Sequence, residues 1–298
     1  MSEFLPVVLP PIDAPEDVER RRGWLTVLWG SRYGRIGVIM VVVVIAAGTL
    51  GILGITPYPP ASQDPTSVLK APSFSHLMGT DQFGRDVFSG TMQGLGVSLE
   101  IAFLSVLIAG VLGTIGGIVA GFLGKWTSAT IMRITDIMFA IPTILFALAI
   151  VTALGPGVID SSIAIGLGWL PIFVRVVRGP VLALRESDFV RAGQVLGFSR
   201  LRLLSRHILP NVFGVIAVQT SLALSWSIIA EAGLSYLGLG PPPPTQSLGD
   251  MVANSSSLAQ TWWWTLVAPS LTIVVAVLGF NFLGDGLRDA SDPRAKSR

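Results

Sequence analysis

Few residues in this chain could carry out covalent chemistry, and they lie far apart in the sequence. There is no cysteine, and the only histidines are His76 and His207, which excludes thiolate catalysis and cysteine metal sites. A nucleotide-binding stretch of the form G-x-x-x-x-G-K-[ST] is absent, because Gly124-Lys125 is followed by Trp126. We therefore expect no catalytic residue, no metal site and no ATPase site on this chain. The remaining charged clusters suit ion pairs, turn capping and docking.

The first charged cluster combines turn-forming residues with opposite charges. Its members are Gly79, Thr80, Asp81, Gly84, Arg85 and Asp86. Thr80 and Asp81 can cap a turn, the two glycines free the backbone, and Arg85 has both aspartates within reach. Two roles are open: a structural knot that fixes the start of the next helix, or a direct substrate contact. We favour the structural role, because turn and capping chemistry already explains these residue types.

The second cluster is the basic segment 185–211. Ser187 can cap a short helix that ends at Gly197, and Ser199 can cap a second helix that runs to Pro210. The first helix is expected to have an apolar stripe with a small centre, made of Phe189, Ala192, Gly193 and Leu196. Such a stripe suits docking into a groove of another protein. The alternative is a basic amphipathic helix that lies on lipid headgroups.

Two further sites carry isolated charges at the ends of apolar stretches. Glu231 is either a helix-end group that faces water or a residue that lines a pathway. Near the C-terminus lies a polar motif made of Asn281, Gly284, Asp285, Arg288 and Asp289. Asp285 and Arg288 are three residues apart, a spacing that allows an ion pair at the cytoplasmic interface. We interpret this motif as a helix terminator and a membrane-surface anchor.

The elements that position these clusters are predicted to be membrane-spanning helices. The chain is 51% hydrophobic and only 13% charged, whereas soluble domains carry about 25% charged residues. A span needs roughly 20 mostly apolar residues. Six segments meet or nearly meet this requirement, at about 36–55, 101–123, 137–154, 161–177, 212–230 and 266–283. The fourth includes Arg175, whose side chain is expected to reach an interface. We predict an all-α membrane protein with six transmembrane helices.

The distribution of basic residues predicts the orientation of these spans. Of the 20 Lys and Arg residues, all except Lys70 and Arg85 fall on one side of the six-span arrangement. Basic residues are retained on the cytoplasmic side, so both termini are predicted to be cytoplasmic. Residues 1–35 are then a cytoplasmic tail with an interfacial segment, 36–298 the transmembrane domain and 56–100 an outer loop. His76 and His207 fall on opposite sides and cannot form one site.

Small residues and prolines predict how the helices pack and bend. Gly113, Gly117 and Gly121 recur at intervals of four in the second span, which favours close approach of another helix. Pro142 and Pro171 interrupt the third and fourth spans and are expected to kink them.

In these motifs and their order, the chain resembles the permeases of binding-protein-dependent ABC importers. Their cytoplasmic loop, E-A-A, three residues, G, nine residues and I-x-L-P, is matched by Arg191, Ala192, Gly193, Gly197, His207, Leu209 and Pro210. Arg191, Gly193 and His207 depart from this pattern. Residues 79–86, 231–240 and 281–294 are similar to signatures of the subfamily that imports dipeptides, oligopeptides and, in some members, nickel.

The resemblance implies a type I ABC importer permease in the inner membrane of a prokaryote. Segment 185–211 would contain the coupling helix, which fits a cleft on an ATPase subunit. The charge reversal at Arg191 argues against carrying over a specific salt bridge. Implied partners are a second related permease, two ABC ATPase subunits that bind ATP and Mg, an extracytoplasmic peptide-binding protein and the lipid bilayer, but no nucleic acid. Glu231 could attract a peptide amino terminus.

Two alternatives to an ABC importer of peptides remain, one with another solute and one with another transport mechanism. The same machinery could import nickel or another small solute. A secondary transporter is the alternative from another class, but such proteins ordinarily show internal repeats and ionisable groups inside their spans. Five of the six predicted spans have no ionisable residue.

Overall fold

The structure is a computed structural model that describes residues 28–291, and this part of the chain is helical without a β-strand. Its helices are α2 (Arg32–Ile52), α3 (Val87–Phe122), α4 (Lys125–Phe139), α5 (Thr143–Leu154), α6 (Val158–Arg185), α7 (Asp188–Val195), α8 (Arg200–Leu203), α9 (Leu209–Tyr236), α10 (Leu248–Ser255) and α11 (Trp263–Ser291). A short 3-10 helix, η1 (Pro65–Ser67), precedes α3, and a π-helical turn, η2 (Leu204–Ile208), joins α8 to α9. The predicted tail up to residue 27 and the basic residues Arg294, Lys296 and Arg298 lie outside the described residues.

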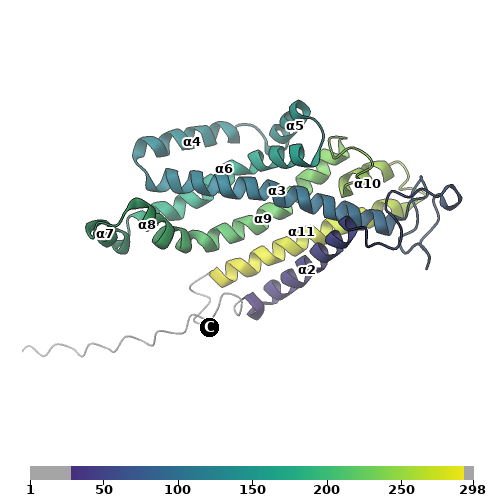
Figure 1. Ribbon diagram of the computed structural model, residues 1–298, viewed down its shortest axis with the longest axis horizontal. Coiled ribbons are helices and arrows are strands. Elements are labelled where there is room, and N and C mark those ends of the chain that lie inside the picture. The colour runs from purple at the N-terminus through teal and green to yellow at the C-terminus, as the bar shows by residue number, and fades with distance from the viewer. Residues whose placement is uncertain (1–27, 292–298) are drawn as a thin grey trace, which may run out of the picture.

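The long helices lie side by side in an elongated bundle (Figure 1). Helices α3, α6 and α9 run along its middle, α2 and α11 along one side, and α4 and α5 along the other. Helices α7 and α8 project at one extremity, which we call the α7 end. Helix α10 and the loop between α2 and α3 lie at the opposite extremity, the α10 end.

The number of membrane spans agrees with the prediction only if one bent pair is counted as a span. Five helical segments are long and apolar enough to cross a membrane: α2, α3, α6, residues 200–236 and α11. Helices α4 and α5 qualify together, but they are bent by 86° relative to each other. The chain is thus a multi-span helical protein with five or six spans among its described residues.

The kink expected at Pro142 in the third span, 137–154, is confirmed as a break between α4 and α5. Pro142 lies at the N-cap of α5 with ψ of 130°, outside the helical region. Proline lacks an N–H and disfavours a helical residue before it, so α4 ends at Phe139. Pro171, by contrast, is buried inside α6, which continues across it to Arg185.

Residues 87–100, in the second half of the predicted outer loop at 56–100, are helical. Helix α3 has 36 residues. It begins at Val87 because Asp86 caps it by accepting a hydrogen bond from the Ser89 N–H. Residues 87–100 mix polar and apolar side chains, so a search for continuous apolar stretches places the start of this helix too late. Helices α6, α9 and α11 likewise extend beyond their apolar cores.

The glycine spacing correctly predicted a close helix contact. A Cβ atom on Gly117 would lie 2.7 Å from Val177 Cβ, and one on Gly121 would lie 2.7 Å from Val181 Cγ1. Gly113 lies in the same way against Phe173. The three glycines of α3 therefore receive side chains of α6 that also recur every four residues. This contact joins the two helices tightly in the centre of the bundle.

Candidate functional site

Helices α7 and α8 and the turn between them form a hairpin at the α7 end. This hairpin is built by local turn chemistry. Helix α7 stops because Gly197 takes a left-handed conformation with φ of +76°, and the Phe198 N–H donates to the Gly193 carbonyl at 2.9 Å. Ser199 caps α8 as predicted, with its Oγ accepting from the Arg202 N–H at 3.3 Å. Ser187 is the N-cap residue of α7, but its hydroxyl donates back to the Leu184 carbonyl. The predicted capping bond from Ser187 is therefore wrong.

The apolar face of α7 differs from the predicted stripe at its centre. Gly193 faces its own chain, where an added Cβ would lie 2.8 Å from Leu203 Cδ2. Val190, three residues earlier, is also buried. The exposed apolar residues of this segment are Phe189, Ala192, Val195 and Leu196, with Val195 88% exposed and Leu196 72% exposed. Gly193 therefore lets α7 lie close to α8 and does not itself meet a partner.

The sequence predicted that the second helix ends at Pro210, but the helix continues past this residue. It passes through the wider turn η2, in which the Leu209 N–H donates to the Leu204 carbonyl, and Pro210 then lies in the first turn of α9. Pro210 has no N–H to donate to the preceding turn, and the wider turn η2 lies just before it. The Asn211 side-chain amide donates to the His207 carbonyl at 2.6 Å. The hairpin is thus continuous with the long helix α9.

Arg191 forms its ion pair within the chain. Its Nη2 atom lies 2.8 Å from Glu186 Oε2, and this hydrogen bond from Arg191 lowers the pKa of the Glu186 carboxyl. Both side chains are largely exposed. The His207 and Phe198 rings stack with their centroids 6.2 Å apart. The Arg202 guanidinium lies over the Phe198 ring, 5.3 Å from its centroid. The hairpin surface therefore combines exposed arginines with apolar side chains.

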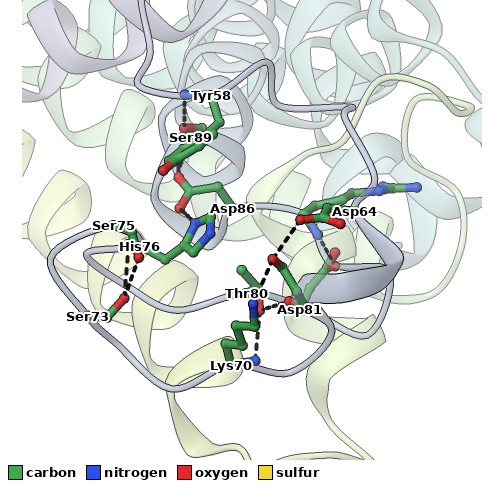
Figure 2. A network of polar contacts seen from close by, with 12 residues as sticks. Tyr58, Asp64, Lys70, Ser73, Ser75, His76, Thr80, Asp81, Asp86 and Ser89 are labelled. Carbon is green, nitrogen blue, oxygen red and sulfur yellow. Dashed lines mark hydrogen bonds and ion pairs between the residues drawn. The ribbon is translucent and has the colours of Figure 1, made fainter.

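At the α10 end, the predicted turn motif forms a polar knot (Figure 2). The buried Thr80 hydroxyl accepts from the Lys70 N–H at 2.8 Å and donates to the Ser67 carbonyl. Asp81 Oδ1 accepts from the backbone N–H groups of Phe83 and Arg85, both at 2.8 Å. Partial burial nevertheless raises the pKa of the Asp81 carboxyl. The predicted turn is confirmed. Gly79 and Gly84 both have φ of +71°, a left-handed conformation that glycine adopts readily.

Asp86 connects this knot to helix α3. Its Oδ2 accepts from the N–H and the hydroxyl of Ser89, at 2.8 and 2.7 Å. Its Oδ1 lies 2.9 Å from His76 Nδ1, and Tyr58 stacks on the His76 ring with centroids 4.7 Å apart. Figure 2 shows His76 pointing into the Asp86 carboxylate from the loop. Sequence reasoning did not assign this role to His76.

Arg85 pairs with neither Asp81 nor Asp86, although both are within its reach in the sequence. Among residues 28–291 no carboxylate lies within ion-pair distance of its guanidinium, which instead lies 4.8 Å from the centroid of the Phe83 ring. The two aspartates are already held by backbone N–H groups, by Ser89 and by His76. Arg85 thus contacts the face of the Phe83 ring, which is as near to it in the sequence as the aspartates are.

Glu231 is buried, with 1% of its surface exposed, which does not fit the alternative in which it is a helix-end group that faces water. Its Oε1 accepts from the Ser235 hydroxyl at 2.7 Å. Its Oε2 is buried beside the hydroxyls of Ser98 and Ser247, without a well-formed hydrogen bond among the described residues. The Leu248 N–H lies 3.4 Å from Ser98 Oγ, so Glu231 sits where α3, α9 and the start of α10 meet. Ser98 and Ser247 were not predicted as its neighbours.

Residues 281–289 of the C-terminal motif lie inside helix α11, which extends to Ser291, the last described residue, so the role of helix terminator stays a prediction. Gly284 lies against Ser221 of α9, whose hydroxyl donates to the Phe280 carbonyl at 2.6 Å. Asn281 is half-buried and Asp289 is exposed. The ion pair that the spacing of Asp285 and Arg288 allows does not form in the described part of the chain. Both side chains instead line a cavity between α6, α9 and α11.

Long apolar helices with a helical hairpin projecting at one end define this protein as a multi-span helical membrane protein. A family model described as "Binding-protein-dependent transport system inner membrane component" matches residues 113–297. The chain belongs to this family of inner-membrane permease components.

Relatives and one solved structure agree with this assignment. The chain is 43% identical to the dipeptide transport system permease protein DppC of Alkalihalophilus pseudofirmus over 237 residues, 80% of this chain and 78% of that protein. It is 40% identical to the di/tripeptide transport system permease protein DppC of Pseudomonas aeruginosa, over 82% of each chain. A chain of the MetNI methionine ABC transporter in inward-facing conformations has a TM-score of 0.55 and 19% identity, covering 69% of this chain and 95% of its own length. The last likeness concerns the fold alone.

Proposed function

We propose that this chain is one permease subunit of an ATP-driven importer of dipeptides or oligopeptides. The relatives named as dipeptide and di/tripeptide permeases support this substrate class, because they match about four fifths of the chain. The complex would contain a second related permease, two ATPase subunits that bind ATP and Mg, and an extracytoplasmic peptide-binding protein. This chain would supply the transmembrane domain at 36–298 and no catalytic group.

In the proposed orientation, the α7 end is cytoplasmic and the α10 end faces outward. Seven arginines lie between Arg175 and Arg206 in α6 and the hairpin, at or near the α7 end. Lys70 belongs to the loop at the α10 end. This asymmetry supports the orientation, since basic residues are retained in the cytoplasm. It also supports a cytoplasmic position for both termini.

The observation that carries the coupling mechanism is the continuity of the hairpin with α9. Exposed apolar residues of α7, Val195 and Leu196 above all, offer a surface to an ATPase subunit. Helix α8 continues through η2 into α9, which reaches the opposite end of the bundle. Closure of the ATPase pair on ATP would move α7, and α9 would carry that displacement toward the outer side. Such a device needs two conformations that ATP populates differently.

Transport by the reconstituted complex tests this proposal. The chain is co-expressed with the neighbouring permease, ATPases and binding protein, and the complex is placed in liposomes with a labelled dipeptide. We expect uptake that requires ATP and the binding protein. Equal uptake without ATP would contradict the ABC mechanism. Uptake of radioactive nickel with no uptake of peptide would favour the alternative solute.

A further inference from the structure

The unpaired charges of the C-terminal motif lie at a cavity of defined size. The cavity has a volume of about 460 Å³ and lies between α6, α9 and α11, near the α7 end of the bundle. Small-molecule sites typically have volumes of about 300–1,000 Å³. This space therefore suits a small organic molecule and is much larger than a single ion needs.

The walls of the cavity differ in chemistry. Val176, Val218 and Leu222 supply apolar surface from α6 and α9, and Gln219 adds a side-chain amide. Asp285 and Arg288 supply one negative and one positive group from α11. An apolar wall with a few placed polar groups is the usual composition of a ligand site.

The two charged groups are available to a ligand. Both side chains are exposed, and within residues 28–291 neither forms an ion pair or a side-chain hydrogen bond. A pair three residues apart on a helix gains only about 0.2–0.5 kcal/mol by pairing, so little opposes a competing partner. A ligand with one cationic and one anionic end could satisfy both groups at once.

The spacing of these groups indicates the length of such a ligand. Residues three apart on a helix have Cβ atoms about 5–6 Å apart. Two amino-acid residues in extended form span at most about 7 Å. A dipeptide with free termini therefore has an ammonium and a carboxylate at a separation similar to that of the two Cβ atoms, and the long Arg288 side chain can adjust to the carboxylate.

We propose that this cavity is an exit-side binding site for short peptides, in which Asp285 binds the α-ammonium and Arg288 the α-carboxylate. This inference rests on the proposed function and orientation, which place the cavity on the cytoplasmic side. The apolar wall accepts the peptide side chains with little selectivity, and Gln219 can bond the peptide group. The site holds a peptide that has crossed the membrane, before its release.

Binding of terminally blocked peptides to charge variants tests this site. The complex is placed without nucleotide in nanodiscs of phosphatidylglycerol, so that no lipid headgroup supplies both charges. Titration calorimetry then measures the affinity for dialanine, N-acetyl-dialanine and dialanine amide. We expect Arg288→Gln to weaken dialanine about tenfold, the loss of one charge-assisted contact, and to leave dialanine amide unchanged. Asp285→Asn should weaken dialanine similarly and leave the N-acetyl peptide unchanged.

Asp289→Asn is the matched control, because Asp289 is exposed on the same helix but does not line the cavity. It should leave all three affinities as in the wild type. Unchanged affinity for the blocked peptide also shows that each variant is folded. Equal losses for free and blocked peptides, an equal loss in Asp289→Asn, or no dialanine binding by the wild type would overturn the site.

The proposed function is judged by a separate measurement. If the wild-type complex fails to import any peptide with ATP, the proposed function fails. If it imports dialanine but the crossed pattern of affinities is absent, only the exit-side site is overturned.

Discussion

Asn211 donates its side-chain amide to the carbonyl of His207 at 2.6 Å, across the start of α9. Pro210 has no N–H, and the π-helical turn η2 widens the backbone just before it. The Asn211 side chain therefore supplies a hydrogen bond at the point where the regular helical ladder is disturbed. It stabilises the junction between the hairpin and the long helix.

The Asn211→Ala variant should loosen this junction without unfolding the protein. The net contribution of one such hydrogen bond is about 0.5–1.5 kcal/mol. We expect more ATP hydrolysed per peptide transported, measured in proteoliposomes, because motion of the hairpin would be transmitted less completely to α9. Thr49→Ala is the control, since it removes a similar side-chain-to-backbone bond, Thr49 to Ile45 at 2.7 Å, in α2. An unchanged ratio in Asn211→Ala would argue against a role of this bond in coupling.

Gly197→Pro should uncouple ATP hydrolysis from transport. Gly197 has φ of +76°, whereas proline is held near −65°, so the turn between α7 and α8 cannot form. An added Cβ meets no atom within 4 Å, so the spans should still insert and the complex assemble. ATPase activity and peptide uptake are measured on the same preparation.

Gly124→Pro is the matched control for this change. Gly124 has φ of −57° with open space around it, and Leu123 before it is extended. Proline fits this backbone. Full transport by Gly197→Pro, or equal damage in Gly124→Pro, would count against the coupling role of the hairpin turn.

Substitutions by alanine at two helical glycines should have opposite signs. At Gly117 an added Cβ would lie 2.7 Å from Val177 Cβ and 2.8 Å from the Val174 carbonyl, so Gly117→Ala must separate α3 from α6. Overpacking of this kind costs about 1–3 kcal/mol. Gly110→Ala, in the same helix α3, would place its Cβ 3.7 Å from the Phe173 ring, an ordinary contact, and should stabilise α3 by up to about 1 kcal/mol. Thermal unfolding of the purified complex in detergent gives both values, and equal shifts would refute the close contact.

The sequence predicted features that depend on backbone geometry and near neighbours. The glycine spacing in α3, the turn at Asp81 and the stop at Gly197 follow from steric rules that act within a few residues. Long charged side chains were predicted less well. Arg85 contacts the Phe83 ring and not an aspartate, because the carboxylates are held by other groups. Several partners are within reach of such a side chain, and the tertiary fold decides among them.

Which residues are buried was harder to predict, because burial depends on contacts between different segments. Glu231 lies beside Ser98 of α3, and Gly193 faces Leu203 of the next helix. Neither neighbour can be inferred from one helix alone. Val190, three residues before Gly193, was a usable signal, since two small or apolar residues at this spacing mark a buried face. The bend at Pro142 was located by its proline, but its size of 86° depends on how α5 packs.

The knot at the α10 end should depend on pH through Asp81. Burial raises the pKa of Asp81 above its ordinary value of 3.8, so the folded loop binds this proton more tightly than the unfolded chain. The stability of the loop should therefore fall as pH rises from 3.8 through the raised pKa. Hydrogen exchange of residues 79–86 measures this change. Asp64 acts oppositely and at lower pH, because Ser67 and Thr66 lower its pKa to about 2.

Asp81→Asn should abolish the fall above pH 3.8 and keep the turn. The amide oxygen of asparagine can still accept the N–H groups of Phe83 and Arg85. Persistence of the same pH dependence in this variant would assign it to another group.

Glu231 is expected to hold the start of α10 against α3 and α9. Glu231→Gln keeps an oxygen that can accept from Ser235 and an amide that can donate to the hydroxyls of Ser98 or Ser247, so it should leave the contact intact. Glu231→Leu has a similar volume but leaves the buried Ser235 hydroxyl without its carboxylate acceptor, at a cost of about 1–3 kcal/mol. Amide exchange at residues 248–255 should therefore increase in the leucine variant and not in the glutamine variant. Equal protection in both would mean that shape alone holds α10, since the two variants differ mainly in hydrogen bonding.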